Sequence, residues 1–307
     1  MKIAVIGAGG VGGYFGGRLA AIGEDVHFVA RGAHLAALQS TGLRIQSPKG
    51  DLHLPRVAAT DDPGSIGSVD VVFFTVKMYD VQPAARLLPP LVGPDTVVIT
   101  LQNGVEAVDI LTNHIGRDHV AGGVAYVAAV ISEPGTIRHT TLDTLIFGEL
   151  DGRRSKRLID LAESGGKAGF HARVSDAINV DLWSKFSRLS VFSGMTAVTR
   201  SPLGVVRDDP ELFGMMTAAI DESIRVAHAC GVPLPDPLVN EIMLMVQKMP
   251  AEAKSSMLED LERGKRLELP WLSGAIVRLG REAGVPTPIH QFIAAVLKPF
   301  QNGTRVR

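Results

Sequence analysis

The sequence predicts an α/β fold in which a doubly wound parallel sheet is followed by an all-helical second domain. Short apolar runs alternate with helical stretches as far as about Val174. Six of the 33 glycines fall between Gly7 and Gly16, directly after the first apolar run. From Asp176 to Phe300 the chain consists of long helical segments broken by prolines, with no convincing strand. Strands that alternate with helices favour a parallel sheet with right-handed crossovers.

The apolar runs define the expected strands. Lys2–Ile6 is a continuous apolar run of the kind that forms a buried parallel strand. The further expected strands are Val26–Ala30, Val69–Val76, Thr96–Leu101, Val120–Ile131 and Thr144–Glu149. The expected helices are Tyr14–Ile22, which Gly23 would cap, and Val81–Leu91. Leu43–Ser47 and Leu52–Ala58 predict a hairpin inserted before the next crossover.

Length and composition limit the function classes. A chain of 307 residues suits two domains, and we expect the boundary between residues 1–174 and residues 175–307. Lys and Arg number 31 against 32 Asp and Glu, so no general charge favours nucleic acid or an anionic membrane. Cys230 is the only cysteine, which excludes an internal disulfide. No apolar run reaches the roughly 20 residues of a membrane span, so we expect a cytoplasmic protein.

The glycines after the first strand form a dinucleotide-binding motif. Gly7-Ala8-Gly9-Gly10-Val11-Gly12 matches the G-x-G-x-x-G pattern between an expected strand and an expected helix. The first glycine permits a tight turn, the second lets the backbone approach a pyrophosphate, and the third allows close helix–strand packing. The helix N-terminus then offers free N–H groups to the phosphates. A purely structural glycine turn is the alternative, but the context predicts a Rossmann-type domain.

The end of the second expected strand bears on the choice of cofactor. A carboxylate is expected there if the ribose 2′-hydroxyl of NAD is to be bound. The chain instead has Val29-Ala30-Arg31-Gly32. A guanidinium pairs with a 2′-phosphate, which a carboxylate would repel. We therefore expect Arg31 to select NADPH, although an ordinary surface arginine is the alternative.

Two further polar positions follow expected strands and should meet the same crevice. Lys77 comes directly after Phe73-Phe74-Thr75-Val76, and Asn103 lies in Gln102-Asn103-Gly104 after the run that ends at Leu101. The amide of Asn103 could hold a nicotinamide, a ribose or a substrate hydroxyl. Ordinary turn chemistry is the alternative for both, because Asn-Gly is a common turn dipeptide.

The helical half offers a lysine and a second polar cluster. Lys185, Leu189 and Ser193 are four residues apart and share one helix face. A half-buried lysine can have a lowered pKa and protonate a carbonyl that is being reduced, although a solvated lysine is the simpler interpretation. Ser256 follows Ser255 in what looks like a helix N-cap, and Glu268 could be a plain surface carboxylate. No H-E-x-x-H or other metal spacing occurs.

Taken together, these motifs resemble the ketopantoate reductase (2-dehydropantoate 2-reductase) family. The resemblance covers nearly the whole chain, and its segments are Gly7–Gly13, Val76-Lys77, Leu101–Val105, Trp183–Lys185, Ser255–Leu258 and Glu268. It implies an NADPH-binding Rossmann-type domain and a helical substrate domain. Lys185 would be the general acid that protonates the forming alkoxide, and Glu268 would bind the substrate hydroxyl or the ammonium and help to position them.

The resemblance assigns further roles residue by residue. Asn103 and Ser256 would hold the substrate, while Arg31 and Lys77 would contact the cofactor. Leu189 and Ser193 stand where the family usually has asparagines, so Ser193 would replace one amide and Leu189 none. A lost polar contact costs about 1–3 kcal/mol, which is enough to shift substrate preference without abolishing reduction.

The expected function is the NADPH-dependent reduction of a 2-oxo acid, with 2-dehydropantoate to (R)-pantoate in pantothenate biosynthesis as the leading assignment. One alternative is a member of the same family that reduces a more apolar 2-oxo acid, as Leu189 suggests. An alternative of another class is a non-catalytic NADPH-binding sensor. The oligomeric state stays open, with a homodimer as one alternative.

Overall fold

The computed structural model describes residues 1–303 and divides the chain into two compact units. The first, here called the sheet unit, comprises Met1–Gln102 and Glu106–Asp181. The second, the helical unit, comprises Asn103–Val105 and the chain from Leu182 onward. The boundary expected between residues 174 and 175 stays a prediction, and residues 304–307 of that second domain lie outside the described residues.

The sheet unit is built on one ten-stranded sheet. Its strands follow the order β4-β3-β9-β8-β7-β6-β1-β2-β5, and β10 pairs with β9. The strands are β1 Lys2–Ile6, β2 Asp25–Val29, β3 Leu43–Gln46, β4 Leu52–Leu54, β5 Ala58–Thr60, β6 Val69–Phe74, β7 Val92–Thr100, β8 Val120–Glu133, β9 Thr136–Glu149 and β10 His171–Val174. All pairs are parallel except β3–β4 and β8–β9. The predicted α/β fold class is confirmed.

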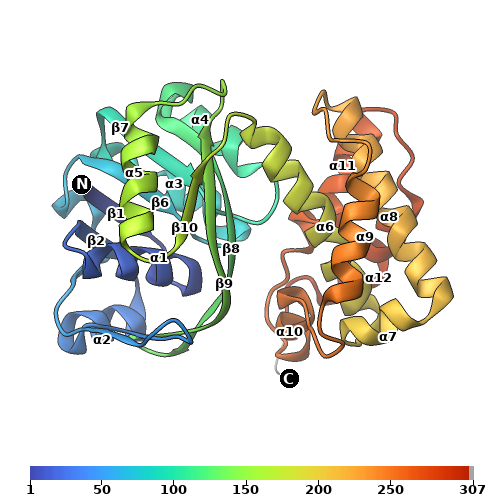
Figure 1. Ribbon diagram of the computed structural model, residues 1–307, viewed down its shortest axis with the longest axis horizontal. Helices are drawn as coiled ribbons and strands as arrows, with labels where there is room; N and C mark the ends of the chain where they lie inside the picture. Colours follow the sequence, from blue (N-terminus) through green and yellow to red (C-terminus); the bar gives the residue numbers. More distant parts are fainter. Residues whose placement is uncertain (304–307) are drawn as a thin grey trace. The chain divides into compact units, whose positions relative to one another are not determined.

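Helices cover this sheet. They are α1 Gly10–Ala21, α2 Gly32–Thr41, α3 Val81–Ala85, α4 Ala107–Ile115 and α5 Lys156–Lys167. Figure 1 shows α1 and α5 in front of the strands and α4 behind them. Ile3, Ala4 and Val5 of β1 are fully buried, as a central strand between two such layers requires.

The register of the central strands sets where their ends lie. Ile6 is paired with Val29 of β2 and with Phe74 of β6, and Phe74 is paired with Thr100 of β7. Four strands therefore end side by side at one edge of the sheet. Ligands of open α/β sheets bind outside this carboxyl edge. The glycine loop and the segments that begin at Ala30, Thr75 and Leu101 all leave from it.

Several sequence predictions of elements need correction. The expected helix Val81–Leu91 is only α3, followed by the 3-10 turn Pro89–Leu91, because Pro89 and Pro90 have no backbone N–H with which to continue the helix. The expected arm Leu52–Ala58 ends at Leu54, and residues from Ala58 form β5 beside β2. The β3–β4 hairpin itself is confirmed, since Leu43 is paired with Leu54.

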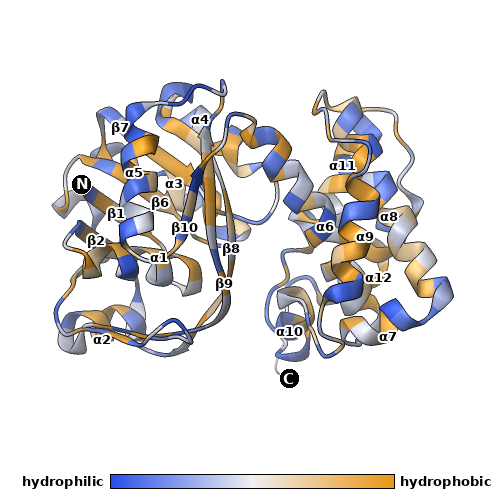
Figure 2. Cartoon of the chain, viewed as in Figure 1, coloured by the Kyte–Doolittle hydropathy of each residue, from blue (hydrophilic) through white to orange (hydrophobic). Residues whose placement is uncertain are grey.

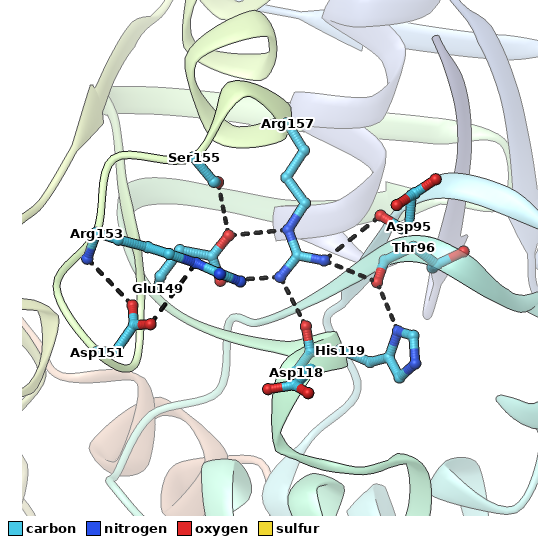
Figure 3. A network of polar contacts seen from close by, with 9 residues as sticks. All are labelled: Asp95, Thr96, Asp118, His119, Glu149, Asp151, Arg153, Ser155 and Arg157. Carbon is cyan, nitrogen blue, oxygen red and sulfur yellow. Dashed lines mark hydrogen bonds and ion pairs between the residues drawn. The ribbon is translucent and has the colours of Figure 1, made fainter.

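A buried ion pair fixes one side of the sheet unit (Figure 3). The carboxylate of Glu149, at the end of β9, accepts hydrogen bonds from Arg157 Nε at 2.8 Å and Nη2 at 2.9 Å, and from the Ser155 hydroxyl at 2.6 Å. Arg157 also donates to the backbone carbonyls of Asp118 and Thr96. Burial raises the pKa of Glu149, but the bonds from Arg157 and Ser155 outweigh it and hold that pKa below its usual value.

The helical unit contains no strand among its described residues, as the sequence predicts. Its helices are α6 Ile178–Thr199 (which begins in the sheet unit), α7 Leu203–Asp208, α8 Pro210–Ala229, α9 Leu238–Lys248, α10 Ser256–Glu262, α11 Ser273–Glu282 and α12 Pro288–Leu297. Figure 2 shows both hydrophobic and hydrophilic residues along α9. Its residues Ile242 and Val246 are buried, whereas Glu241 and Gln247 are exposed.

The core of the helical unit contains a buried carboxylate that caps a helix. Both oxygens of Glu222 on α8 accept backbone N–H groups at the start of α12, from Ile289 at 2.9 Å and His290 at 3.1 Å. A carboxylate at a helix N-terminus satisfies free N–H groups and complements the helix dipole.

The described part of the chain holds no helix long and apolar enough to cross a bilayer.

Candidate active site

The backbone of the glycine loop has the geometry that a bound pyrophosphate requires. Gly7 has a φ of +97°, a conformation that side chains disfavour. A Cβ on Gly12 would lie 2.5 Å from the Gly7 carbonyl oxygen, and one on Gly10 would lie 2.0 Å from that of Ala129. Gly9, in contrast, has nothing within 4 Å of its Cβ position. The loop is therefore tightly packed at Gly10 and Gly12 but has open space at the Cβ position of Gly9. Val11, at the start of α1, is half-buried.

Two side chains hold the glycine loop in place. The Thr75 hydroxyl donates to the Gly7 carbonyl at 2.6 Å. His34 Nδ1 accepts the backbone N–H of Gly135 at 3.1 Å, so its proton lies on Nε2, which donates to the Ala8 carbonyl at 2.8 Å. Burial lowers the pKa of His34, which keeps this tautomer neutral. The sequence does not predict this role of His34; its position three residues after Arg31 is the signal that points to it.

A cavity of about 250 Å³ opens beside the glycine loop. Gly7 and Gly9 line one part of it, and Arg31 and His34 line another. Arg31 is exposed and is the residue just before helix α2. Arg31 thus lines a cavity that begins at the phosphate-binding motif, and these residues fit a dinucleotide with an extra phosphate on its ribose.

The remaining strand ends carry the other predicted cofactor residues. Lys77 is half-buried and precedes the 3-10 turn Met78–Asp80. Gln102 is buried, and its amide donates to the carbonyls of Phe74 at 2.7 Å and Val76 at 3.1 Å. It therefore joins two strand ends, a role that the sequence did not reveal. Asn103, one residue further on, already belongs to the helical unit.

Within the helical unit, Lys185 and Glu268 act on one another although they are far apart in sequence. Burial lowers the pKa of the Lys185 ammonium, the positive charge of Arg188 also lowers it and the carboxylate of Glu268 raises it, and together they place it at about 8. Glu268 is 5% exposed. A lysine poised near neutral pH beside a buried carboxylate is suited to proton transfer.

The loop that carries Asn103 lies beside the residues that follow Glu268. Gly104 has a φ of +107°, and a Cβ there would lie 2.9 Å from the carbonyl oxygen of Trp271. Trp271 closes the 3-10 turn Leu269–Trp271, which begins directly after Glu268. Only glycine permits both this conformation and this approach. This contact therefore joins the residue that follows Asn103 to the turn that follows Glu268.

Ser256 and Ser193, the two serines expected near the substrate, lie in different surroundings. Ser255, which precedes Ser256, is the N-cap of α10: its hydroxyl oxygen accepts the Leu258 N–H at 3.1 Å and lies 2.7 Å from that of Thr196 on α6. Ser256 is the first residue of α10 and is exposed. Ser193 is fully buried, and its hydroxyl has no hydrogen-bond partner among the described residues. No cluster of metal-binding side chains occurs in that part of the chain either.

The Rossmann-type sheet, its open glycine loop and the poised lysine define a class, the nicotinamide-dinucleotide-dependent oxidoreductases. Comparison with known families makes this specific. The family described as "Ketopantoate reductase PanE/ApbA" matches residues 3–152, and "Ketopantoate reductase PanE/ApbA C terminal" matches residues 177–301. The chain therefore belongs to the ketopantoate reductase family, as the sequence motifs predict.

Individual relatives agree. The chain is 34% identical to a 2-dehydropantoate 2-reductase of Mesorhizobium japonicum, over 97% of each chain. It is 30% identical to an uncharacterized oxidoreductase of Bacillus subtilis, YkpB, over 98% of this chain and 99% of that one. A solved ketopantoate reductase family structure from Ralstonia eutropha superposes with a TM-score of 0.90 at 34% identity, covering 98% of both chains. The predictions of an NADP-dependent oxidoreductase acting on a CH–OH group and of NADPH as cofactor are confirmed.

Proposed function

We propose that the protein reduces a 2-oxo acid with NADPH, and that 2-dehydropantoate, converted to (R)-pantoate for pantothenate biosynthesis, is its substrate. The observation that carries this proposal is Lys185, whose pKa burial lowers to about 8 beside Glu268. Carbonyl reduction needs a hydride and a proton, and a proton donor works best when its pKa lies near the working pH. Family membership supports the choice of substrate.

The residues of the helical unit supply the proton chemistry. Bound NADPH supplies the hydride that forms the new C–H bond at the carbonyl carbon. The Lys185 ammonium donates a hydrogen bond to the carbonyl oxygen, stabilises its growing negative charge and delivers the proton that forms the O–H bond. Lys185 is left as a neutral amine and takes up a proton from water. Glu268 keeps Lys185 protonated before this step and binds the substrate hydroxyl; Asn103 and Ser256 hold the remaining polar groups.

The sheet unit would bind the cofactor. The open backbone above Gly9 would face the pyrophosphate, with Gly7, Gly10, Val11 and Gly12 shaping the turn. Lys77 and Asn103 follow strand ends at the carboxyl edge, where they would contact the nicotinamide ribose. Arg31 would pair with the 2′-phosphate, because this residue lines the cavity beside the loop.

Replacing Arg31 tests the cofactor part. In Arg31→Ala, Kd for NADPH should rise about 10- to 100-fold while Kd for NADH changes less than about threefold, because only NADPH carries the phosphate. Binding can be followed by the fluorescence of the reduced nicotinamide. Arg56→Ala, which removes another exposed arginine of the same unit, should change neither value. Equal weakening of both cofactors would exclude the phosphate contact.

A more apolar substrate is the second candidate, because Leu189 cannot donate a hydrogen bond. It is half-buried on α6, one turn beyond Lys185. A leucine at this place would suit a 2-oxo acid with an alkyl or aryl group in place of the hydroxyl of 2-dehydropantoate.

Steady-state kinetics with a panel of 2-oxo acids test the reaction and its substrate together. We expect kcat/KM to be highest for 2-dehydropantoate, and a clear preference for an apolar 2-oxo acid would favour the second candidate. Lys185→Ala should lower kcat by about 10²- to 10⁴-fold and leave NADPH binding nearly intact. A wild-type protein that binds NADPH but turns over no 2-oxo acid would instead support the sensor alternative.

A cytoplasmic location and a homodimer stay predictions.

A further inference from the structure

Helix α6 presents one half-buried strip in the helical unit. Between Leu182 and Ala197 every residue is buried except five, which are Ser184, Lys185, Arg188, Leu189 and Phe192. Their spacing of three and four residues places them on one face of the helix. This strip therefore contains the proposed proton donor, a second cation and two apolar side chains, while the rest of this segment is buried.

Arg188 lies within electrostatic reach of Lys185. It follows Lys185 by three residues, a spacing that brings Cβ atoms to about 5–6 Å in a helix. Its positive charge contributes to the lowered pKa of Lys185, second only to burial. The guanidinium is also positioned by α9, since Nη1 lies 2.7 Å from Met245 Sδ. Arg188 is thus a half-buried, oriented guanidinium beside the ammonium that faces the carbonyl in the proposed reaction.

The chemistry of a 2-oxo acid matches this pair of cations. Its carboxylate is bonded directly to the carbonyl carbon, so a side chain that binds the carboxylate must neighbour the one that protonates the carbonyl oxygen. A guanidinium binds a carboxylate through two parallel N–H···O bonds, whereas an ammonium acts as a point donor. Leu189 and Phe192 on the same strip would then contact the carbon chain beyond the carbonyl.

We infer that Arg188 is the residue that binds the substrate carboxylate and so selects 2-oxo acids over neutral carbonyl compounds. The inference rests on the proposed function, because it takes Lys185 as the proton donor to the adjacent carbonyl. Bidentate binding fixes the plane of the acid, and the carbonyl oxygen is thereby aimed at Lys185.

The test compares a 2-oxo acid with its neutral methyl ester in wild type, Arg188→Gln and Arg188→Lys. For the acid, Arg188→Gln should raise KM about 10- to 100-fold with a smaller change in kcat, because a charged hydrogen-bonding partner is lost. For the ester, kcat/KM should change less than threefold, since it has no carboxylate to lose. Arg188→Lys keeps the charge without the planar fork and should fall between wild type and Arg188→Gln for the acid.

A matched control separates this effect from a general loss of charge. Arg225→Gln removes an exposed arginine of α8 that pairs with Asp221 at 2.8 Å, and it should leave both substrates unaffected. Equal losses for acid and ester in Arg188→Gln, or no loss for the acid, would overturn the inference while the proposed function stands. A wild-type protein that reduces no 2-oxo acid would overturn both. If Arg188→Gln does not fold, as judged by circular dichroism, the acid-to-ester ratio of Arg188→Lys decides.

Discussion

The two units each bury a glutamate beside a basic side chain, and the two pairs differ in how completely they are satisfied. In the sheet unit, Glu149 is 3% exposed, and Arg157 binds it through two nitrogens (Figure 3). The remaining Arg157 donors reach backbone carbonyls. In the helical unit, Glu268 is 5% exposed and acts on Lys185, whose pKa nevertheless falls to about 8.

The difference separates a structural pair from one suited to chemistry. In the Glu149–Arg157 pair the hydrogen bonds outweigh burial, so the pKa of Glu149 stays below its usual value. In the second pair the attraction of Glu268 does not compensate for burial and for the neighbouring Arg188. The Lys185 ammonium therefore gives up its proton more readily than a solvated lysine. Burial of a charged side chain does not by itself indicate a catalytic site, whereas a side chain whose pKa is shifted toward the working pH does.

Replacing the cation of each pair by methionine should show the largest contrast. Arg157→Met leaves the Glu149 carboxylate buried without its main partner and should lower the free energy of unfolding by about 3–5 kcal/mol. Lys185→Met removes an ammonium whose burial is unfavourable but also takes a positive charge away from buried Glu268, so stability should change much less than in Arg157→Met while activity is lost. Equilibrium unfolding in urea measures both changes.

The same measurement carries an internal control. Arg153 pairs with Asp151 at 3.6 Å on the surface, with both side chains more than half exposed, so Arg153→Met should cost less than about 1 kcal/mol. The deficit of Arg157→Met should also shrink as the pH falls below the ordinary Glu pKa of 4.5, because protonation removes the buried charge. A pH-independent deficit, or one no larger than that of Arg153→Met, would show that the Glu149 pair is not what stabilises the sheet unit.

The contrast between the pairs also shows what the sequence could predict. The glycine loop was predictable because its motif is local: Gly7 to Gly12 follow a strand and precede a helix. The strands around it were predictable from their continuous apolar runs. The helix expected to continue to Leu91 failed where two prolines outweighed its hydrophobic pattern.

Contacts between distant residues could not be read in this way. No periodicity or motif in the sequence predicts the Glu149–Arg157 network or the hydrogen bond from His34 to the Ala8 carbonyl, because each depends on how strands and loops pack. Lys185 and Glu268 were singled out individually, but only the fold shows that one shifts the pKa of the other. The sequence does not single out Arg188 for the same reason, because its place on the half-buried strip depends on what covers the other faces of α6.

The pH dependence of turnover gives the smaller but more direct test of the comparison. Because Lys185 must be protonated to donate its proton, kcat/KM should be level below about pH 8 and fall about tenfold per pH unit above it. The limb reports the free enzyme, and a solvated lysine would place it near 10.5. Stability should move in the opposite direction: the folded pKa lies below the unfolded one, so the wild type gains stability relative to Lys185→Met as pH rises from about 8 toward 10.5. A kinetic limb near 10.5 together with a flat stability difference would show that Lys185 titrates as an ordinary solvated lysine, and the contrast drawn between the two pairs would disappear.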